Sequence, residues 1–353
     1  MRAAMLVVVG FVVCSSMALG DVAMQWAAVG NPGNAPDAAG AGAVASMYFI
    51  GKYEVTNSQY ADFLNAKAAA DPLALYNANM GSNVTGGIVR SGASGSYAYA
   101  VKSGYENQPV VYVGWYDAVR FSNWMNNGRG NGDTESGAYT LLGAAPVPSN
   151  ASSIVRNAGA KVFLPTLDEW YKAAYHQPAS AGGDADSYWT YPTRTNIAPH
   201  SDQPPGAPAI ANNVANCYRN EGGANGYDDG YAVTGSTVLD SSVNYLTAMG
   251  AFSESGSYYG TFDQGGNVNE WLEAISAGPF HANLKGGSWM NNFGDLGSKG
   301  IYSSDRPTEN TTFGFRVAGT VPEPGAGAGV AIMGAGLLAR RSRIMPKASK
   351  VST

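Results

Sequence analysis

Apolar residues recur at helical spacing in three segments, and each segment begins at a recognisable helix start. Thr56 has Gln59 three residues later, which is the pattern of a capping box, and apolar residues at helical spacing follow. Thr166 and Glu169 repeat this pattern directly after a proline. The segment 115–126 carries apolar residues on one face, and a glycine follows it as a stop. The sequence therefore predicts three helices, which begin near positions 57, 115 and 167.

Between these helices the pattern favours short strands and long loops. Apolar and β-branched runs predict strands at 47–50, 110–113, 161–164 and 313–318. The stretches 128–160 and 179–211 are rich in Gly, Ser, Asn, Asp and Pro, which is typical of loops. Loops of this length within one domain usually carry function or are supported by an ion.

The composition narrows the classes of protein that fit. Among 353 residues there are 46 Gly and 18 Pro, an excess that favours turns and argues against long helices or coiled coil. Lys and Arg number 21 against 26 Asp and Glu, for a net charge of −5, and no basic run stands out in the body of the chain. We therefore expect no nucleic-acid partner. The 21 Tyr and seven Trp argue against disorder.

The N-terminus has the pattern of a secretory signal peptide over residues 1–20. Arg2 precedes an apolar stretch over 3–13, and Ala18-Leu19-Gly20 offers a small-residue cleavage site. Cleavage there would remove Cys14 and leave Cys217 as the single cysteine of the mature chain, so no internal disulfide is expected. A buried N-terminal strand is the alternative interpretation of this segment.

The C-terminal residues 320–353 have a three-part pattern. Val321-Pro322-Glu323-Pro324 precedes an apolar, Gly- and Ala-rich run over 325–339, and an Arg cluster follows at 340–343. A positive cluster after an apolar run is a stop-transfer arrangement. This tail resembles the PEP-CTERM sorting signal, which implies export to the cell surface or extracellular matrix of a bacterium and transient membrane association through the tail. A flexible linker is the alternative, but it would not explain the Arg cluster.

Six sequence blocks follow one another in the body of the chain, between residues 21 and 319. They read GKYEVTN from position 51, PVVYVGWYDA from 109, FLPTLDEW from 163, GNVNEW from 266, KGGSW from 285 and GFRVA from 314. In this order they resemble the formylglycine-generating enzyme, or sulfatase-modifying factor, family from about Met24 to Gly319. The resemblance implies a single irregular α+β domain with a C-type-lectin-like fold, loop-rich, with short strands and about three helices.

The resemblance also implies where catalysis would lie. The founding enzymes hold copper(I) with two cysteines shortly after the Gly-Gly-Ser block, and copper(I) prefers such thiolates. The matching positions here are Asn291 and Leu296, and no cysteine occurs from 218 to 353. We therefore expect no copper site and no formylglycine-generating oxidase. Ser288 matches the family's active-site serine, but a serine needs a neighbouring base to act as a nucleophile.

A second branch of the family uses a three-histidine iron site. The three histidines here, His176, His200 and His281, are widely separated, and none has the spacing that lets one helix offer two ligands. That branch also carries a helical domain for which this chain has no room. We expect these histidines to be surface or loop residues.

Oxygen-bearing residues match the family's two structural calcium sites. Calcium takes six to eight oxygen ligands from carboxylates and carbonyls. The resemblance implies one site from the side chains of Asp263 and Glu270 with the carbonyls of Gly266 and Val268. It implies a second site from the side chains of Asn216 and Asp229 with the carbonyls of Cys217 and Tyr231. The alternative is that these acids cap turns without metal.

Two classes of function remain open. The first is a non-catalytic binding or structural module of the cell envelope, with an unknown protein or polysaccharide ligand. Three aromatic residues, Tyr188, Trp189 and Tyr191, lie near Asp184 and Asp186 and would either stack on a sugar or pack their own loop. The second is a metal-dependent oxidase or modifying enzyme of the same family.

Overall fold

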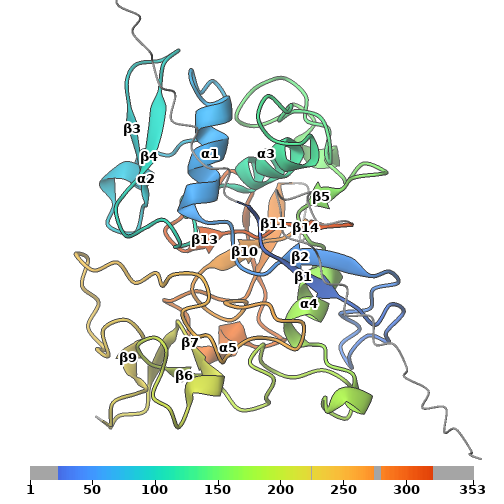
Figure 1. The fold of residues 1–353 in the computed structure, drawn as a ribbon, viewed down its shortest axis with the longest axis vertical. Helices are drawn as coiled ribbons and strands as arrows, with labels where there is room; N and C mark the ends of the chain where they lie inside the picture. The colour runs from blue at the N-terminus through green and yellow to red at the C-terminus, as the bar shows by residue number, and fades with distance from the viewer. Residues whose placement is uncertain (1–22, 224, 274–279, 321–353) are drawn as a thin grey trace, which may run out of the picture. The chain divides into compact units, whose positions relative to one another are not determined.

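The predicted helices are confirmed in a computed structural model that describes residues 23–223, 225–273 and 280–320. The long helices are α1 (Asn57–Lys67), α3 (Trp115–Asn126) and α4 (Leu167–Tyr175). Both capping boxes form: Gln59 N–H donates to Thr56 Oγ1, and Glu169 N–H donates to Thr166 Oγ1. Two single-turn helices, α2 (Asn79–Ser82) and α5 (Phe293–Leu296), were not expected. Figure 1 shows α1 and α3 side by side.

The predicted signal peptide, and the sorting tail from residue 321 onward, lie outside the described residues. No helix in the described ranges is both long enough and apolar enough to cross a membrane.

The first of two four-stranded sheets joins the two ends of the described chain. It contains β1 (Trp26–Val29), β2 (Tyr48–Gly51), β14 (Ala318–Gly319) and β5 (Val162–Phe163), in that spatial order. All neighbours in it are antiparallel. The pairing of β2 with β14 therefore places the first and last sequence blocks against each other.

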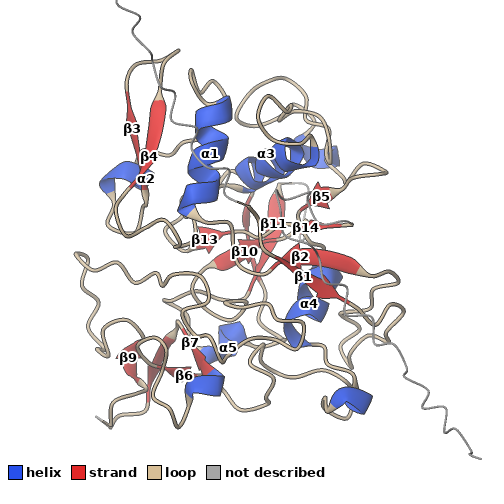
Figure 2. Cartoon of the chain, in the orientation of Figure 1, coloured by secondary structure: helices blue, strands red, loops and turns tan. Residues whose placement is uncertain are grey.

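The second sheet lies under the candidate site. Its spatial order is β12 (Tyr302–Asp305), β11 (His281–Lys285), β10 (Asn269–Trp271) and β13 (Phe313–Gly314). The pair β10 and β13 is parallel, and the others are antiparallel. Loops connect most of the elements, as Figure 2 shows.

Three two-stranded pairs complete the strands of the described part. They are β3 (Ile88–Ser91) with β4 (Ala98–Val101), β6 (His200–Ser201) with β7 (Val214–Ala215), and β8 (Tyr218–Asn220) with β9 (Asp229–Tyr231).

Two strand predictions differ from the structure. The segment 110–113 is buried but forms no strand, because Tyr112 adopts a positive φ of 61° and breaks the extended run. The segment 313–318 is divided between β13 in one sheet and β14 in the other. The residues between these short strands, which include Arg316, therefore cross the interior from one sheet to the other.

The core is built largely from aromatic side chains. Trp115, Trp170 and Trp271 are fully buried. Phe121 stacks on Tyr60 at 6.1 Å between ring centroids and meets Phe315 edge-on at 5.3 Å. Because each such ring removes a large apolar area from water, these contacts hold α1 and α3 against the sheets.

Candidate functional site

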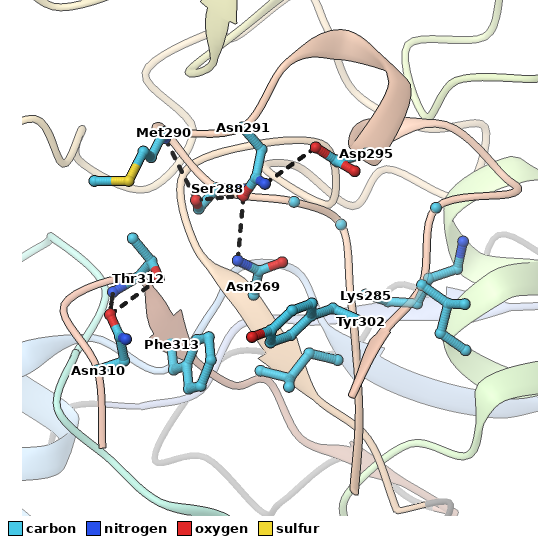
Figure 3. A pocket seen from close by; sticks show the side chains of 15 residues that line it. Asn269, Lys285, Ser288, Met290, Asn291, Asp295, Tyr302, Asn310, Thr312 and Phe313 are labelled. Atoms are coloured by element: carbon cyan, nitrogen blue, oxygen red, sulfur yellow. Dashed lines mark hydrogen bonds between the residues drawn. The ribbon is translucent and has the colours of Figure 1, made fainter. Parts of the chain in front are cut away.

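A polar cavity of about 240 Å³ opens where β10, β11 and β13 meet the segment that follows β11. Its polar lining comes from Asn269, Ser288, Asn291, Asp295, Asn310 and Thr312. Figure 3 shows the first four of these side chains converging above the sheet. We call this cavity the Asn291 pocket.

Asn291 is the centre of the hydrogen-bond network in this pocket. Its Oδ1 atom accepts from Ser288 Oγ at 2.6 Å, from the Ser288 N–H at 3.0 Å and from Asn269 Nδ2 at 3.4 Å. Its Nδ2 atom donates to Asp295 Oδ2 at 3.1 Å. The Ser288 hydroxyl thus donates its hydrogen bond to an amide oxygen. An amide oxygen is not a base that could activate the serine as a nucleophile.

The rim of the pocket is apolar and exposed. Met290 is 44% exposed and Tyr302 is 54% exposed, and both line the opening. Phe313 closes the floor from β13. A polar centre with an apolar rim is the usual composition of a binding site, in which a few polar groups fix the orientation of the ligand.

The residue at the second expected thiol position lies elsewhere. Leu296 is fully buried at the end of α5, in an apolar cluster with Tyr191, Ala215 and Cys217. Cys217 is the only cysteine among the described residues, so no cysteine pair is seen. Burial raises the pKa of the Cys217 thiol to about 12, so it stays protonated, and a protonated thiol is neither a nucleophile nor a metal ligand.

A buried charged cluster lies near the first predicted calcium site. Glu270 accepts from Arg316 through both carboxylate oxygens, and its Oε2 also accepts from the Trp170 indole N–H at 2.7 Å. Glu54 is buried as well; its Oε1 accepts from Asn267, and its Oε2 has no hydrogen-bond partner among the described residues.

The pKa directions in this cluster follow from crowding of buried carboxylates. Burial first, and then the Asp263 carboxylate, raise the pKa of Glu54 well above its ordinary value. Burial raises the pKa of Asp263 to about 6, against a lowering effect of its hydrogen bond from the Gly250 N–H. Three carboxylates therefore share one arginine in a low-dielectric environment.

Asp263 and Gly266 of the predicted first set lie on one tight turn, whereas Glu270 lies on β10. Asp263 and Gly266 have positive φ values of 61° and 97°. A Cβ atom on Gly266 would lie 2.3 Å from the Asn216 carbonyl oxygen, so only glycine fits there. The turn is fixed by the Asn267 N–H, which donates to that same carbonyl at 2.9 Å. The structure thus brings Asn216 of the second set against the turn of the first.

The second set is only partly brought together. The Cys217 carbonyl accepts from the Ala232 N–H at 3.2 Å, which places Cys217 beside Tyr231. Asp229 lies opposite Asn220, the last residue of β8, and β8 begins two residues after Asn216.

The histidines lie apart from one another in the structure. His176 Nδ1 contacts the Tyr259 hydroxyl at 2.8 Å, His200 Nδ1 pairs with the buried Asp228 at 2.7 Å, and His281 Nε2 pairs with Asp305 at 3.0 Å. Within the described ranges, no group of three or more His, Cys, Asp or Glu side chains is placed to hold a metal ion.

Some residues that shape the site were not singled out in the sequence. Glu54 and Arg316 occur inside the GKYEVTN and GFRVA blocks, where they read as block members without a role. An ionisable residue between two apolar residues of such a block could have indicated that its side chain is buried. The burial depends on the segment that crosses from one sheet to the other, and hydrophobic periodicity does not reveal such a crossing.

Comparisons with known proteins agree with this fold. The family model described as sulfatase-modifying factor enzyme 1-like domain matches residues 16–321. The crystal structure of CarF has a TM-score of 0.52 at 20% identity, over 84% of this chain and 98% of CarF. The variable protein 1 of Treponema denticola has a TM-score of 0.50 at 18% identity, over 86% of this chain and 97% of that protein. No curated protein matches the sequence.

The two solved structures show the same fold at low identity, while the family model spans most of the chain. The part of the chain that the family model matches is a single loop-rich α+β domain, whose described residues form short strands and three helices longer than six residues. The chain therefore belongs to the sulfatase-modifying factor enzyme 1-like family.

Proposed function

We propose that this chain is an exported protein of the bacterial cell envelope, and that its domain binds a ligand and does not oxidise one. The observation that carries the proposal is the network around Asn291, where the founding enzymes of the family would have a copper-binding thiol. An amide held by Ser288 and Asp295 supplies hydrogen bonds but no soft ligand for copper(I).

The Asn291 pocket suits a polar ligand with an apolar part. Carboxylate and amide groups of Asp295 and Asn310 line it, and the exposed Met290 and Tyr302 form its rim. A protein segment or a polysaccharide of the envelope would offer groups for both. Export rests on the signal-peptide pattern of residues 1–20 and on the tail of 320–353.

We also propose a structural calcium at Asp263, Glu270 and the carbonyls of Gly266 and Val268. The support is electrostatic, because Asp263, Glu270 and Glu54 are buried near a single arginine and a cation would offset the excess negative charge. To bind the ion, Glu270 would exchange one of its two hydrogen bonds with Arg316 for calcium. We propose a second calcium at the side chains of Asn216 and Asp229 and the carbonyls of Cys217 and Tyr231. The support is the family resemblance together with the contact that places Cys217 beside Tyr231.

The test of the main proposal is incubation of the mature chain with a Cys-x-Pro-x-Arg peptide, with and without copper. A formylglycine-generating enzyme serves as the positive control, and mass spectrometry detects the aldehyde. We expect no aldehyde above the level without protein. Aldehyde formation would overturn the proposal, and copper or iron at one per purified chain would favour the metal-dependent oxidase instead.

Export has its own test. Residues after about Pro324 should be removed from the secreted form or held in the membrane. The intact mass of the secreted protein measures this, and a mass that includes Arg340 to Thr353 would contradict the sorting interpretation of the tail.

A further inference from the structure

A second and larger cavity, of about 660 Å³, lies on the other side of Lys285 from the Asn291 pocket. It is lined by the loop of 37–41, by α4, by the segment 184–190 and by residues 298–301. In Figure 3 the Lys285 side chain points away from Asn291, and Lys285 also lines this second cavity. The volume is within the range of small-ligand sites. We call it the Trp189 groove.

The aromatic rings of the groove are fixed before any ligand arrives. The Tyr171 hydroxyl donates to Asp37 Oδ2 at 2.5 Å. The Tyr188 hydroxyl lies 2.8 Å from the Ala35 carbonyl and 2.9 Å from the Gly42 carbonyl, which compete for its single proton. The Trp189 indole N–H donates to Gln177 Oε1 at 3.0 Å. Rings held in this way lose little conformational entropy on binding.

The three aromatic residues singled out in the sequence differ in their exposure. Tyr188 and Tyr191 are buried and pack their own loop, as the second interpretation of that cluster expected. Trp189 is only half-buried and faces the cavity. It is therefore the ring of the three that a ligand can reach.

Polar groups with remaining hydrogen-bond capacity border these rings. Asp186 is exposed, and its Oδ1 accepts from the Tyr188 N–H at 2.9 Å, which orients the carboxylate. Asp184 Oδ2 accepts from Asn196 Nδ2 at 2.6 Å, and both line the cavity. The exposed Lys299, from the lining segment 298–301, adds a donor. Carboxylates accept from hydroxyl groups, and ammonium and amide groups donate to them.

The charges of the groove select among ligand classes. Lys285 already lies over the Tyr171 ring, at 5.3 Å from its centroid, and donates to the Ser298 carbonyl at 2.7 Å. Burial lowers the pKa of Lys285 to about 7, so its charge is not what excludes a cation. Its amine already covers this face of the Tyr171 ring, so an organic cation would find the aromatic floor occupied. A polyanion would meet Asp37, Asp184 and Asp186. A neutral ligand rich in hydroxyl groups, with an apolar ring face, avoids both conflicts.

We propose that the Trp189 groove binds a short neutral pyranose segment of a polysaccharide, with Trp189 against one sugar face and Asp184, Asp186 and Lys299 bonded to its hydroxyl groups. This site rests on the proposed binding role of the domain and gives that role a ligand class. It is separate from the Asn291 pocket.

The test is calorimetric titration of the full mature chain with cellotetraose, chitotetraose and mannotetraose, with tetragalacturonate and tetramethylammonium as the charged alternatives. We expect at least one neutral oligosaccharide to bind at millimolar or lower concentration. Trp189→Ala should weaken that binding about tenfold, which corresponds to about 1.4 kcal/mol. Trp189→Phe keeps a ring and should retain most of it, and Asp186→Asn should weaken it less than Trp189→Ala.

Tyr258→Ala, at an exposed aromatic residue that lines neither cavity, is the matched control and should bind the sugar as the wild type does. Unchanged melting temperatures would show that the groove variants are folded. The proposal is overturned if no neutral oligosaccharide binds at millimolar concentration, if only a charged probe binds, or if folded Trp189→Ala and the wild type bind equally. Failure of the proposed function would instead appear as aldehyde formation, which these titrations do not measure.

Discussion

Arg316 and Glu270 form a bidentate ion pair with both side chains fully buried, at 2.5 Å from Nε to Oε2 and 2.5 Å from Nη2 to Oε1. The Arg316 guanidinium also donates to the carbonyls of Gly51 and Phe262. Three segments that are distant in sequence, around residues 51, 262–270 and 316, therefore meet at one side chain. The crossing from β13 to β14 makes this possible, because it carries Arg316 through the interior.

Glu270→Gln should destabilise the domain strongly. The amide removes the charge that compensates Arg316, and leaving one partner of a buried pair typically costs about 3–5 kcal/mol. Urea unfolding of the wild type and the variant would measure the change in the free energy of unfolding. Asp305→Asn, at an exposed carboxylate, is the control and should change little. A loss for Glu270→Gln as small as that of the control would show that the pair contributes little.

The sequence predictions were right where structure depends on neighbouring residues and incomplete where it depends on tertiary contacts. The capping boxes of Thr56 and Thr166 act within one turn, so local sequence was enough to predict where α1 and α4 begin. The burial of Glu54 and Arg316 depends on two sheets meeting, and local sequence does not contain that information. The same holds for the segment 313–318, whose division between two sheets follows from tertiary pairing.

The candidate site was also predicted only in part from the sequence. The position of Asn291 relative to the Gly-Gly-Ser block was enough to predict that it lies at the site, and the structure places it at the centre of the pocket. Leu296 was counted from the same block, but the turn of α5 carries it into an apolar cluster with Cys217. Asp295, one residue earlier, lines the pocket instead.

Thr166→Ala should cost about 1 kcal/mol, because it removes the hydroxyl that caps α4. The Glu169 N–H, now bonded to Thr166 Oγ1 at 3.1 Å, would lose its partner. Thr166→Ser keeps the hydroxyl and should retain most of the stability. Denaturant midpoints of the three proteins would decide the matter, and equal midpoints for the alanine and serine variants would contradict the capping role.

Asp263→Asn should change how stability depends on pH in calcium-free buffer. The pKa of this carboxyl is about 6 in the folded chain against 3.8 for the ordinary group, so the folded state binds more protons between these values. Its contribution to the free energy of unfolding therefore falls as the pH rises through that window. His176, whose pKa burial lowers to about 4, acts in the opposite direction, so the difference between wild type and variant isolates Asp263. A difference that stays constant from pH 4 to 6 would contradict the raised pKa.

Calcium should stabilise the wild type and have a smaller effect on the same Asp263→Asn variant. An ion that binds only the folded state adds about 2.7 kcal/mol when its concentration is 100 times the Kd, which is a few degrees in Tm for a domain of this size. The variant keeps one carbonyl oxygen but loses the charge, so its Tm should differ less between millimolar calcium and excess chelator. Asp229→Asn is the matched control: if the first set alone binds calcium, this variant should respond as the wild type does. A wild-type Tm that is the same with chelator and with calcium would return Asp263 and Glu270 to the role of turn and ion-pair residues without metal.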